Sequence, residues 1–185
     1  MSELAKQFVW YVAYGSNILE ERFMNYIKGG KFRLGGSYLP GCNDKKPPTA
    51  EKPSKINYEL FFAKHSSSWG GGVAFISQCE NKNKLTHVRM WKVTFQQFLE
   101  IKKQEGGWYN KQIDLGKDSD GITMMTFTND QCLQFTKPSS DYLKTIMLGL
   151  REINLDDEQI IKYIIETAGV EKNFSVQDLR NILAI

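Results

Sequence analysis

Two short stretches of the chain carry residues that could take part in chemistry. The first is Val12–Asn17, where an apolar segment stops at Gly15 and a segment with helical spacing begins. A tight turn from a strand into a helix directs backbone N–H groups at one point, and the helix dipole adds partial positive charge there. Such a turn can hold a carboxylate or a developing oxyanion. An ordinary bend that needs a glycine is the alternative, and local physics alone favours it.

The second stretch surrounds Glu105, at the predicted end of a helix just before Gly106 and Gly107. The partial negative charge of a helix C-terminus disfavours an ionised carboxylate, and Trp108 is expected to shield this one from water. Both effects raise a carboxyl pKa toward the range useful for general acid–base chemistry. A glutamate before a Gly-Gly helix end is more often a solvated surface residue, so position alone favours that alternative.

Metal-binding and nucleophilic chemistry have little support in the sequence. The two histidines stand alone, and the three cysteines lack the spacing of metal ligands. No metal and no cofactor are therefore expected. Residues 70–72 are three glycines without the Lys-Ser or Lys-Thr of a phosphate-binding loop, so they predict either a flexible turn or close approach of the backbone to a ligand.

Length, composition and charge are typical of one globular domain. The chain has 185 residues, of which 41% are hydrophobic, so it can bury a sizeable core. Its formal net charge of +3, from 24 basic and 21 acidic residues, argues against a nucleic-acid partner. An odd number of widely spaced cysteines suits a reducing compartment. Because no apolar run approaches the roughly 20 residues of a membrane span and no signal peptide is recognisable, we expect a cytoplasmic protein without a membrane partner.

Hydrophobic periodicity predicts the elements that must position these residues. Strands are expected at 8–14, 32–40, 58–63, 72–77, 85–93, 108–115 and 122–127, and helices at 18–27, 94–104, 139–153, 156–168 and 175–183. Four of the five prolines fall between positions 40 and 53, so this stretch is expected to be an exposed loop. Strands and helices do not alternate as in a doubly wound fold, which favours an α+β fold with a mixed or barrel-like sheet.

Two of the predicted helices begin with the spacing of a capping box, in which the first and fourth residues exchange hydrogen bonds through their side chains and backbones. The pairs are Asn17 with Glu20 and Thr94 with Gln97. The helix that starts near Thr94 is expected to end at a glycine with positive φ, at position 106 or 107.

Four segments together resemble the γ-glutamylcyclotransferase family, which includes AIG2-like proteins and enzymes acting on γ-glutamyl amines. Tyr14-Gly15-Ser16-Asn17-Ile18 is similar to its Tyr-Gly-Ser-Asn-Leu turn, and Gln104-Glu105-Gly106 to its catalytic Glu followed by Gly. Trp69-x-Gly71-Gly72-Val73-Ala74 resembles its Gly-Gly-Ile-Ala segment, and Ser140–Lys144 with Met147-x-Gly149 its C-terminal helix. The segments follow the family's order between residues 9 and 165.

The resemblance implies a small mixed β-barrel with flanking helices. It implies a cyclotransferase-like β-barrel domain over residues 1–150 and a C-terminal helical extension over 151–185 packed on the same domain. The family reaction converts an L-γ-glutamyl compound into 5-oxoproline and a free amine or amino acid, without metal or cofactor. A small-molecule γ-glutamyl substrate is therefore the expected partner.

The resemblance also implies roles for single residues. Glu105 would act as general acid and base, taking a proton from the substrate's α-amine and giving one to the leaving nitrogen. The implied substrate-binding residues are Tyr14, Gly15, Ser16, Asn17, Tyr109 and Tyr142. A non-catalytic small-molecule or partner-binding module with the same pocket is the alternative. The substrate's identity, the oligomeric state (a homodimer among the options) and the roles of the 43–53 loop and the 175–184 helix stay open.

Overall fold

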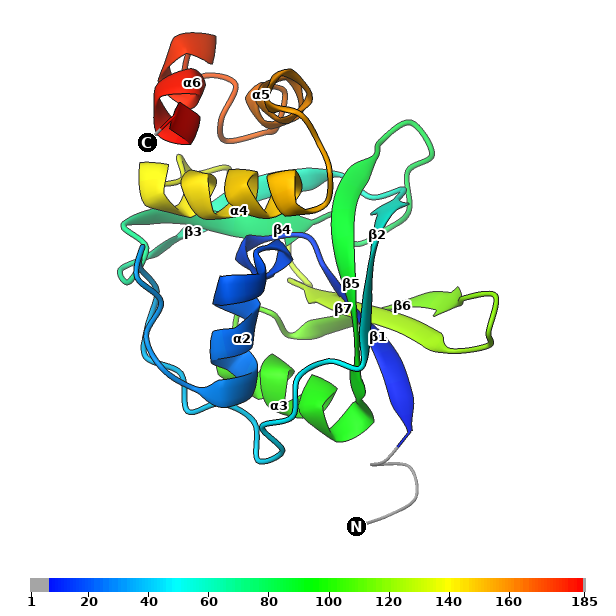
Figure 1. The fold of residues 1–185 in the computed structure, drawn as a ribbon. Coiled ribbons are helices and arrows are strands. Elements are labelled where there is room, and N and C mark those ends of the chain that lie inside the picture. The colour runs from blue at the N-terminus through cyan, green and yellow to red at the C-terminus, as the bar shows by residue number, and fades with distance from the viewer. Residues whose placement is uncertain (1–6, 185) are drawn as a thin grey trace.

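The structure, a computed structural model, describes residues 7–184 and combines two β-sheets with helices on several sides (Figure 1). In chain order, the elements are β1 (Phe8–Ala13), the 3₁₀ helix η1 (Ser16–Ile18), α2 (Glu20–Lys28), β2 (Ala50–Ile56), β3 (Leu60–Ser66), β4 (Gly71–Ile76), β5 (Thr86–Thr94), α3 (Phe95–Glu105), β6 (Lys111–Lys117), β7 (Thr123–Thr128), α4 (Ser140–Glu152), α5 (Asp157–Ile165) and α6 (Val176–Ala184). Each of the five expected helices is present, and the α+β class is confirmed.

The strands form two separate sheets and not the closed barrel that the resemblance implied. The larger sheet has the order β2-β5-β1-β7-β6, and β3 pairs only with β4 in the smaller one. Within residues 7–184, the edge strands β2 and β6 do not pair with each other, so the larger sheet stays open. The β3–β4 ribbon is joined to the rest by isolated bridges to loop residues such as Phe135 and Pro138, and these cannot close a barrel.

Strand β1 lies at the centre of the larger sheet and separates two hydrophobic clusters. It runs antiparallel to β5 and parallel to β7. Successive side chains of a strand point to opposite faces. Trp10 and Val12 accordingly join one cluster, and Val9 and Tyr11 join the other. The apolar run at the start of the sequence therefore forms a strand that is buried on both faces. The residues that follow this strand begin in the interior of the molecule.

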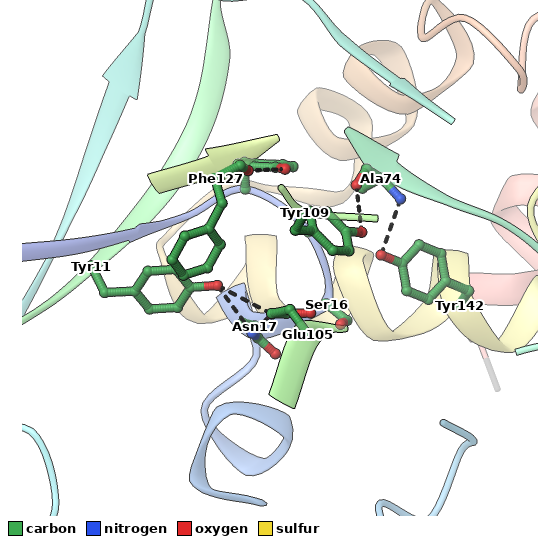
Figure 2. Close-up of a pocket in the computed structure, with 10 residues that line it drawn as sticks. Tyr11, Ser16, Asn17, Ala74, Glu105, Tyr109, Phe127 and Tyr142 are labelled. Carbon is green, nitrogen blue, oxygen red and sulfur yellow. Dashed lines mark hydrogen bonds between the residues drawn. The ribbon is translucent and has the colours of Figure 1, made fainter. Parts of the chain in front are cut away.

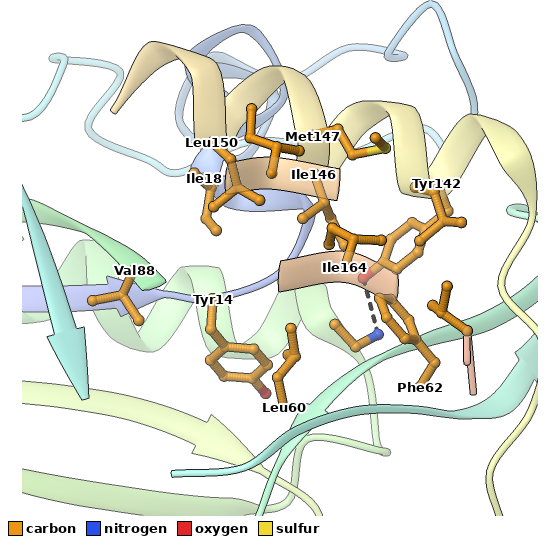
Figure 3. Close-up of a cluster of buried hydrophobic side chains, with 14 of the residues drawn as sticks. Tyr14, Ile18, Leu60, Phe62, Val88, Tyr142, Ile146, Met147, Leu150 and Ile164 are labelled. Atoms are coloured by element: carbon orange, nitrogen blue, oxygen red, sulfur yellow. Dashed lines mark hydrogen bonds between the residues drawn. The ribbon is translucent and has the colours of Figure 1, made fainter. Parts of the chain in front are cut away.

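The first cluster fills the space between helix α4 and the strands beside it (Figure 3). Tyr142, Ile146 and Leu150 of α4 face this cluster, together with Phe62 of β3. Helices α5 and α6 lie against α4 (Figure 1). The expected boundary between residues 150 and 151 falls inside α4. The division into a domain and a C-terminal extension stays a proposal, in which the extension consists of α5 and α6.

Two expectations for the segment between α2 and β3 are wrong. The strand expected at 32–40 is not formed; a single bridge joins Gly30 to Leu39. Gly35 and Gly36 have φ values of 146° and 77°, which do not fit a strand. The expected loop ends early, because residues from Ala50 onward form β2. Pro53 is tolerated there because β2 is an edge strand that pairs only with β5.

Two glycines of the 70–72 run, Gly71 and Gly72, lie close to the backbone of the 136–139 segment. Gly72 N–H donates to the Lys137 carbonyl at 2.8 Å, and a Cβ on Gly71 would lie 2.7 Å from the Ser139 backbone nitrogen. Strand β4 can therefore lie beside the 136–139 segment only because these residues lack side chains.

Gly149 of α4 packs directly against the turn that follows β1. A Cβ at this position would lie 2.5 Å from the Leu19 nitrogen and 2.8 Å from the Ile18 carbonyl carbon. Backbone atoms cannot rotate aside, so Gly149→Ala must push α4 and the turn apart. We expect the free energy of unfolding to fall by about 1–3 kcal/mol, although alanine gains about 1 kcal/mol of helix propensity over glycine.

Urea denaturation of the wild type and the variant measures this difference. Gly107→Ala is the control, because a Cβ there would meet nothing within 4 Å and the residue has no positive φ. Equal unfolding midpoints for Gly149→Ala and the wild type would contradict the close contact.

Candidate functional site

Two adjacent hollows lie where the end of β1, the end of α3, strand β4 and the start of α4 meet. The inner cavity has a volume of about 20 Å³, room for about one water-sized group. It is lined by Tyr11, Tyr14, Gly15, Ser16, Asn17, Ala74, Glu105, Tyr109, Phe127 and Tyr142 (Figure 2). A second hollow, the outer chamber, has a volume of about 270 Å³. The two share Ser16, Glu105, Tyr109 and Tyr142.

The carboxylate of Glu105, the last residue of α3, is held through both of its oxygens. Asn17 Nδ2 donates to Oε1 at 2.7 Å, and the Tyr26 hydroxyl donates to Oε2 at 2.9 Å. The Tyr11 hydroxyl lies 3.5 Å from Oε1 (Figure 2). These partners come from η1, α2 and β1, so three elements fix the direction of one side chain.

The surroundings of Glu105 change its acidity in the expected direction. Burial raises the pKa of this carboxyl, and the nearby Arg22 charge and the hydrogen bonds from Tyr26, Asn17 and Tyr11 lower it, with a net rise. The expected cause needs correction, because the indole of Trp108 is 38% exposed and lines only the outer chamber. Side chains from β1, α2 and η1 enclose the carboxylate instead.

Asn17 does not cap a helix as the sequence predicted. The N-cap of α2 is Leu19, and no side chain caps that helix. The 3₁₀ turn η1 displaces Asn17 from the capping position, and its amide points to Glu105 and to the Tyr11 hydroxyl, 3.1 Å away. Its buried Oδ1 has no hydrogen-bond partner among the described residues. The predicted box of Thr94 and Gln97, in contrast, is confirmed.

The three tyrosines named in the sequence analysis all reach the inner cavity, with different hydroxyl partners. Tyr14 donates to the Phe127 carbonyl at 2.6 Å, so β7 engages its hydroxyl. Tyr109 donates to the Ala74 carbonyl at 2.8 Å, and the Ala74 N–H donates to Tyr142 at 3.1 Å (Figure 2). Burial raises the pKa of Tyr142 to about 12 and those of the other two well above the usual value. All three hydroxyls are therefore protonated at neutral pH.

Strand β5 supports the Tyr14–Asn17 turn from the opposite side. Trp91 Nε1 donates to the Asn17 carbonyl at 2.9 Å, and Arg89 Nη1 donates to the Ile18 carbonyl at 3.1 Å. Both donors are buried. They satisfy carbonyls that the short 3₁₀ helix leaves free, and so hold the turn in place without entering the cavity.

The sequence analysis missed five residues that hold Glu105, line the outer chamber or support the turn: Tyr11, Arg22, Tyr26, Arg89 and Trp91. One signal was present for two of them. Arg22 and Tyr26 are four residues apart, so on a helix they share one face. Phe23 and Ile27, the next residue after each, form an apolar stripe on the neighbouring face of the helix. An arginine beside a buried apolar stripe is expected to be buried too.

The structure brings all seven expected site residues to one cavity, and their roles in binding or catalysis stay predictions. Between residues 7 and 184, no three His, Cys, Asp or Glu side chains gather closely enough to hold a metal ion. In the same range, the helices are too short or too polar to cross a membrane.

Comparison with known proteins shows similarity in fold. No family model matches the chain. A gamma-glutamyl cyclotransferase structure is 22% identical with a TM-score of 0.63, and the match covers 96% of this chain and 99% of that one. The structure of an uncharacterized protein from Homo sapiens gives the same values. YkqA from Bacillus subtilis is 17% identical with a TM-score of 0.56, over 86% of this chain and 54% of that one.

One curated relative matches in sequence. Histone deacetylase 5 from Arabidopsis thaliana is 30% identical over 192 residues, which cover 82% of this chain. The chain spans only 29% of the length of that relative. The match therefore concerns a part of a much longer protein.

Proposed function

Because the chain has the fold of gamma-glutamyl cyclotransferase, we propose that it converts an L-γ-glutamyl compound into 5-oxoproline and a free amine or amino acid. The observation that carries this proposal is the carboxylate of Glu105. It has a raised pKa, faces a cavity and is oriented by Asn17 and Tyr26. A raised pKa makes the carboxylate a stronger base, which suits it to accept a proton and to return it later.

In the proposed reaction, the substrate's α-nitrogen attacks its own γ-carbonyl carbon. A C–N bond forms, the carbonyl oxygen takes up negative charge, and collapse of this intermediate breaks the bond to the leaving nitrogen. The α-nitrogen starts as an ammonium and ends as a lactam N–H, so it loses two protons, and the leaving nitrogen gains two. Glu105 carries one proton from the first nitrogen to the second, and the other exchanges through water.

The remaining residues would hold the substrate folded back on itself. Attack within one molecule needs no enzyme nucleophile, and correct placement of the two groups supplies much of the rate. The backbone N–H groups of Gly15, Ser16 and Asn17 donate no hydrogen bond to any described residue, so they are available to the substrate's α-carboxylate or to the developing oxyanion. The unpartnered Oδ1 of Asn17 is a matching acceptor for the α-ammonium. Tyr109 and Tyr142 would form the cavity wall.

Incubation of the protein with a panel of γ-glutamyl dipeptides and γ-glutamyl amines, read out as 5-oxoproline by mass spectrometry, tests the proposal. We expect release of 5-oxoproline from at least one member of the panel. No turnover, together with thermal stabilisation by a ligand that lacks a γ-glutamyl group, would favour the non-catalytic binding module. A small-molecule partner and a cytoplasmic location are part of the same proposal.

A further inference from the structure

Arg22 on α2 is a buried cation with unused hydrogen-bond donors. The residue is 3% exposed. Its Nη2 donates to the Tyr26 hydroxyl at 3.3 Å, and its Nε and Nη1 have no partner among the described residues. A buried charge is costly unless it is paired and hydrogen-bonded. These buried donors lack an acceptor among the described residues, so an acceptor from outside the chain would satisfy them.

Comparison with the other buried arginine shows how unusual this is. Arg89 is similarly buried and pairs with the carboxylates of Glu20, Glu51 and Glu152. Arg22 makes no ion pair within 4 Å of its nitrogens among residues 7–184. It acts on Glu105 only at longer range and through the hydroxyl of Tyr26. The chain thus pairs one of its buried guanidinium groups directly with carboxylates, whereas the other reaches a carboxylate only through the Tyr26 hydroxyl.

The guanidinium of Arg22 is oriented and enclosed by aromatic rings. Its central carbon lies 4.8 Å from the ring centre of Tyr26 and 5.4 Å from that of Trp69. Such cation–π contacts stabilise the charge and limit the directions in which the group can point, while Nε and Nη1 keep unused donors for a planar acceptor. A Cβ on Gly36 would lie 3.3 Å from Nη2 of Arg22 and 3.1 Å from the Trp69 ring. The 32–40 segment, which does not form the expected strand, therefore packs over Arg22 and Trp69.

Arg22 lines the outer chamber and not the inner cavity. Glu105 lines both, so the chamber adjoins the place where a scissile amide would lie. Ser37, Ser66 and Ser68 add hydroxyl groups to its wall. The planar, negatively charged group that best matches a stacked guanidinium with free N–H donors is a carboxylate, which arginine binds in a bidentate manner.

We propose that Arg22 binds a carboxylate on the leaving part of the substrate, so that the protein prefers γ-glutamyl amino acids or peptides to γ-glutamyl amines. This inference rests on the proposed function. The turn at Tyr14–Asn17 and Glu105 face the glutamyl part, whose α-amine must reach the general base. Arg22 lies in the larger hollow beyond Glu105, where the group that departs as an amine or amino acid has room.

The test compares two substrates that differ by one carboxylate, γ-glutamyl-alanine and γ-glutamyl-ethylamine. For the wild type, we expect kcat/KM to be at least about 10-fold higher with the first. Arg22→Gln is expected to lower kcat/KM for γ-glutamyl-alanine at least about 10-fold more than for γ-glutamyl-ethylamine, mainly through KM. A smaller loss shared by both substrates is expected as well, because Arg22 acts on the pKa of Glu105 and donates to Tyr26. Arg22→Lys should restore part of the preference, because it keeps the charge and loses the fork.

Arg33→Gln is the matched control, because Arg33 is an exposed arginine near the same helix that pairs with Glu21. It is expected to leave both values unchanged. Equal losses on both substrates in Arg22→Gln would overturn the proposal, since they would mean that Arg22 binds the α-carboxylate or acts through Glu105. A wild type without preference between the two substrates would overturn it even if the variant does not fold. If the wild type releases 5-oxoproline from no γ-glutamyl compound, it is the proposed function that fails.

Discussion

Glu105→Gln is expected to abolish 5-oxoproline release while the protein stays folded. Glutamine keeps the shape of the side chain and one acceptor oxygen, but its amide NH2 cannot accept a hydrogen bond or take up a proton from the substrate's amine. Loss of a positioned general base lowers rates by about 10²–10⁴-fold. Single-turnover assays with the best substrate of the panel measure this, because they follow the chemical step directly.

Glu100→Gln is the matched control for this variant. Glu100 lies on the same helix and its carboxylate accepts hydrogen bonds from Asn43 and Gln96, away from the cavity. It should keep wild-type activity. Full activity of Glu105→Gln would remove Glu105 from the mechanism, and equal losses in both variants would point to damage to α3.

The pH dependence of stability gives a second readout on Glu105→Gln. Because the pKa of Glu105 is raised above 4.5 in the folded protein, the folded state binds this proton more tightly than the unfolded state does. The stability of the wild type therefore falls as pH rises from the unfolded value through the folded one. The neutral glutamine lacks this loss. We expect the variant to be at least as stable as the wild type at pH 7, with the difference disappearing below the usual carboxyl pKa.

Arg89→Ala is expected to cause a large loss of stability, because one buried side chain connects several elements. Its guanidinium pairs with Glu51 of β2 at 2.6 Å and with Glu152 of α4 at 2.5 Å, and lies 3.6 Å from Glu20 of α2. It also donates to the Ile18 carbonyl in the turn. Its removal leaves three carboxylates close together and one carbonyl without its donor.

The expected decrease in the free energy of unfolding is about 2–4 kcal/mol, at the lower end for a broken buried pair. The carboxylates are 37–59% exposed, so water can solvate them in part. Arg151→Ala is the control, because its pair with Asp157 is exposed and should contribute less than about 1 kcal/mol. Urea denaturation measures both variants. Similar losses in the two would show that the Arg89 cluster acts like an ordinary surface pair.

Arg89→Ala should also lower activity through the turn that it supports. The Ile18 carbonyl adjoins Asn17, whose amide orients the Glu105 carboxylate. A shift of this turn moves the base relative to the substrate, and small misplacements lower rates strongly. Arg89 of β5 is therefore expected to affect both the free energy of unfolding and the activity.

The sequence by itself determined the α+β class, the five helices and most of the strands. These features follow from local physics: alternating and 3.6-residue periodicities, the capping box of Thr94, and the glycine with positive φ that ends α3 at Gly106. Local patterns also placed Glu105 and the turn at Tyr14–Asn17 at the ends of elements, and the resemblance to the γ-glutamylcyclotransferase family, not local physics, favoured a functional role for both.

Only the tertiary structure decided what these residues contact. Asn17 has the local spacing of a helix cap, but its amide binds Glu105, 88 residues away, because η1 intervenes and α3 ends beside it. Tertiary pairing also decides strand β2, which forms despite Pro53 because it can pair with β5 at the edge of the larger sheet. In the described range, β2 and β6 do not pair with each other, so the larger sheet stays open. Contacts between distant segments depend on tertiary packing, which local sequence patterns do not encode. Arg22 is buried without a direct ion pair for the same reason.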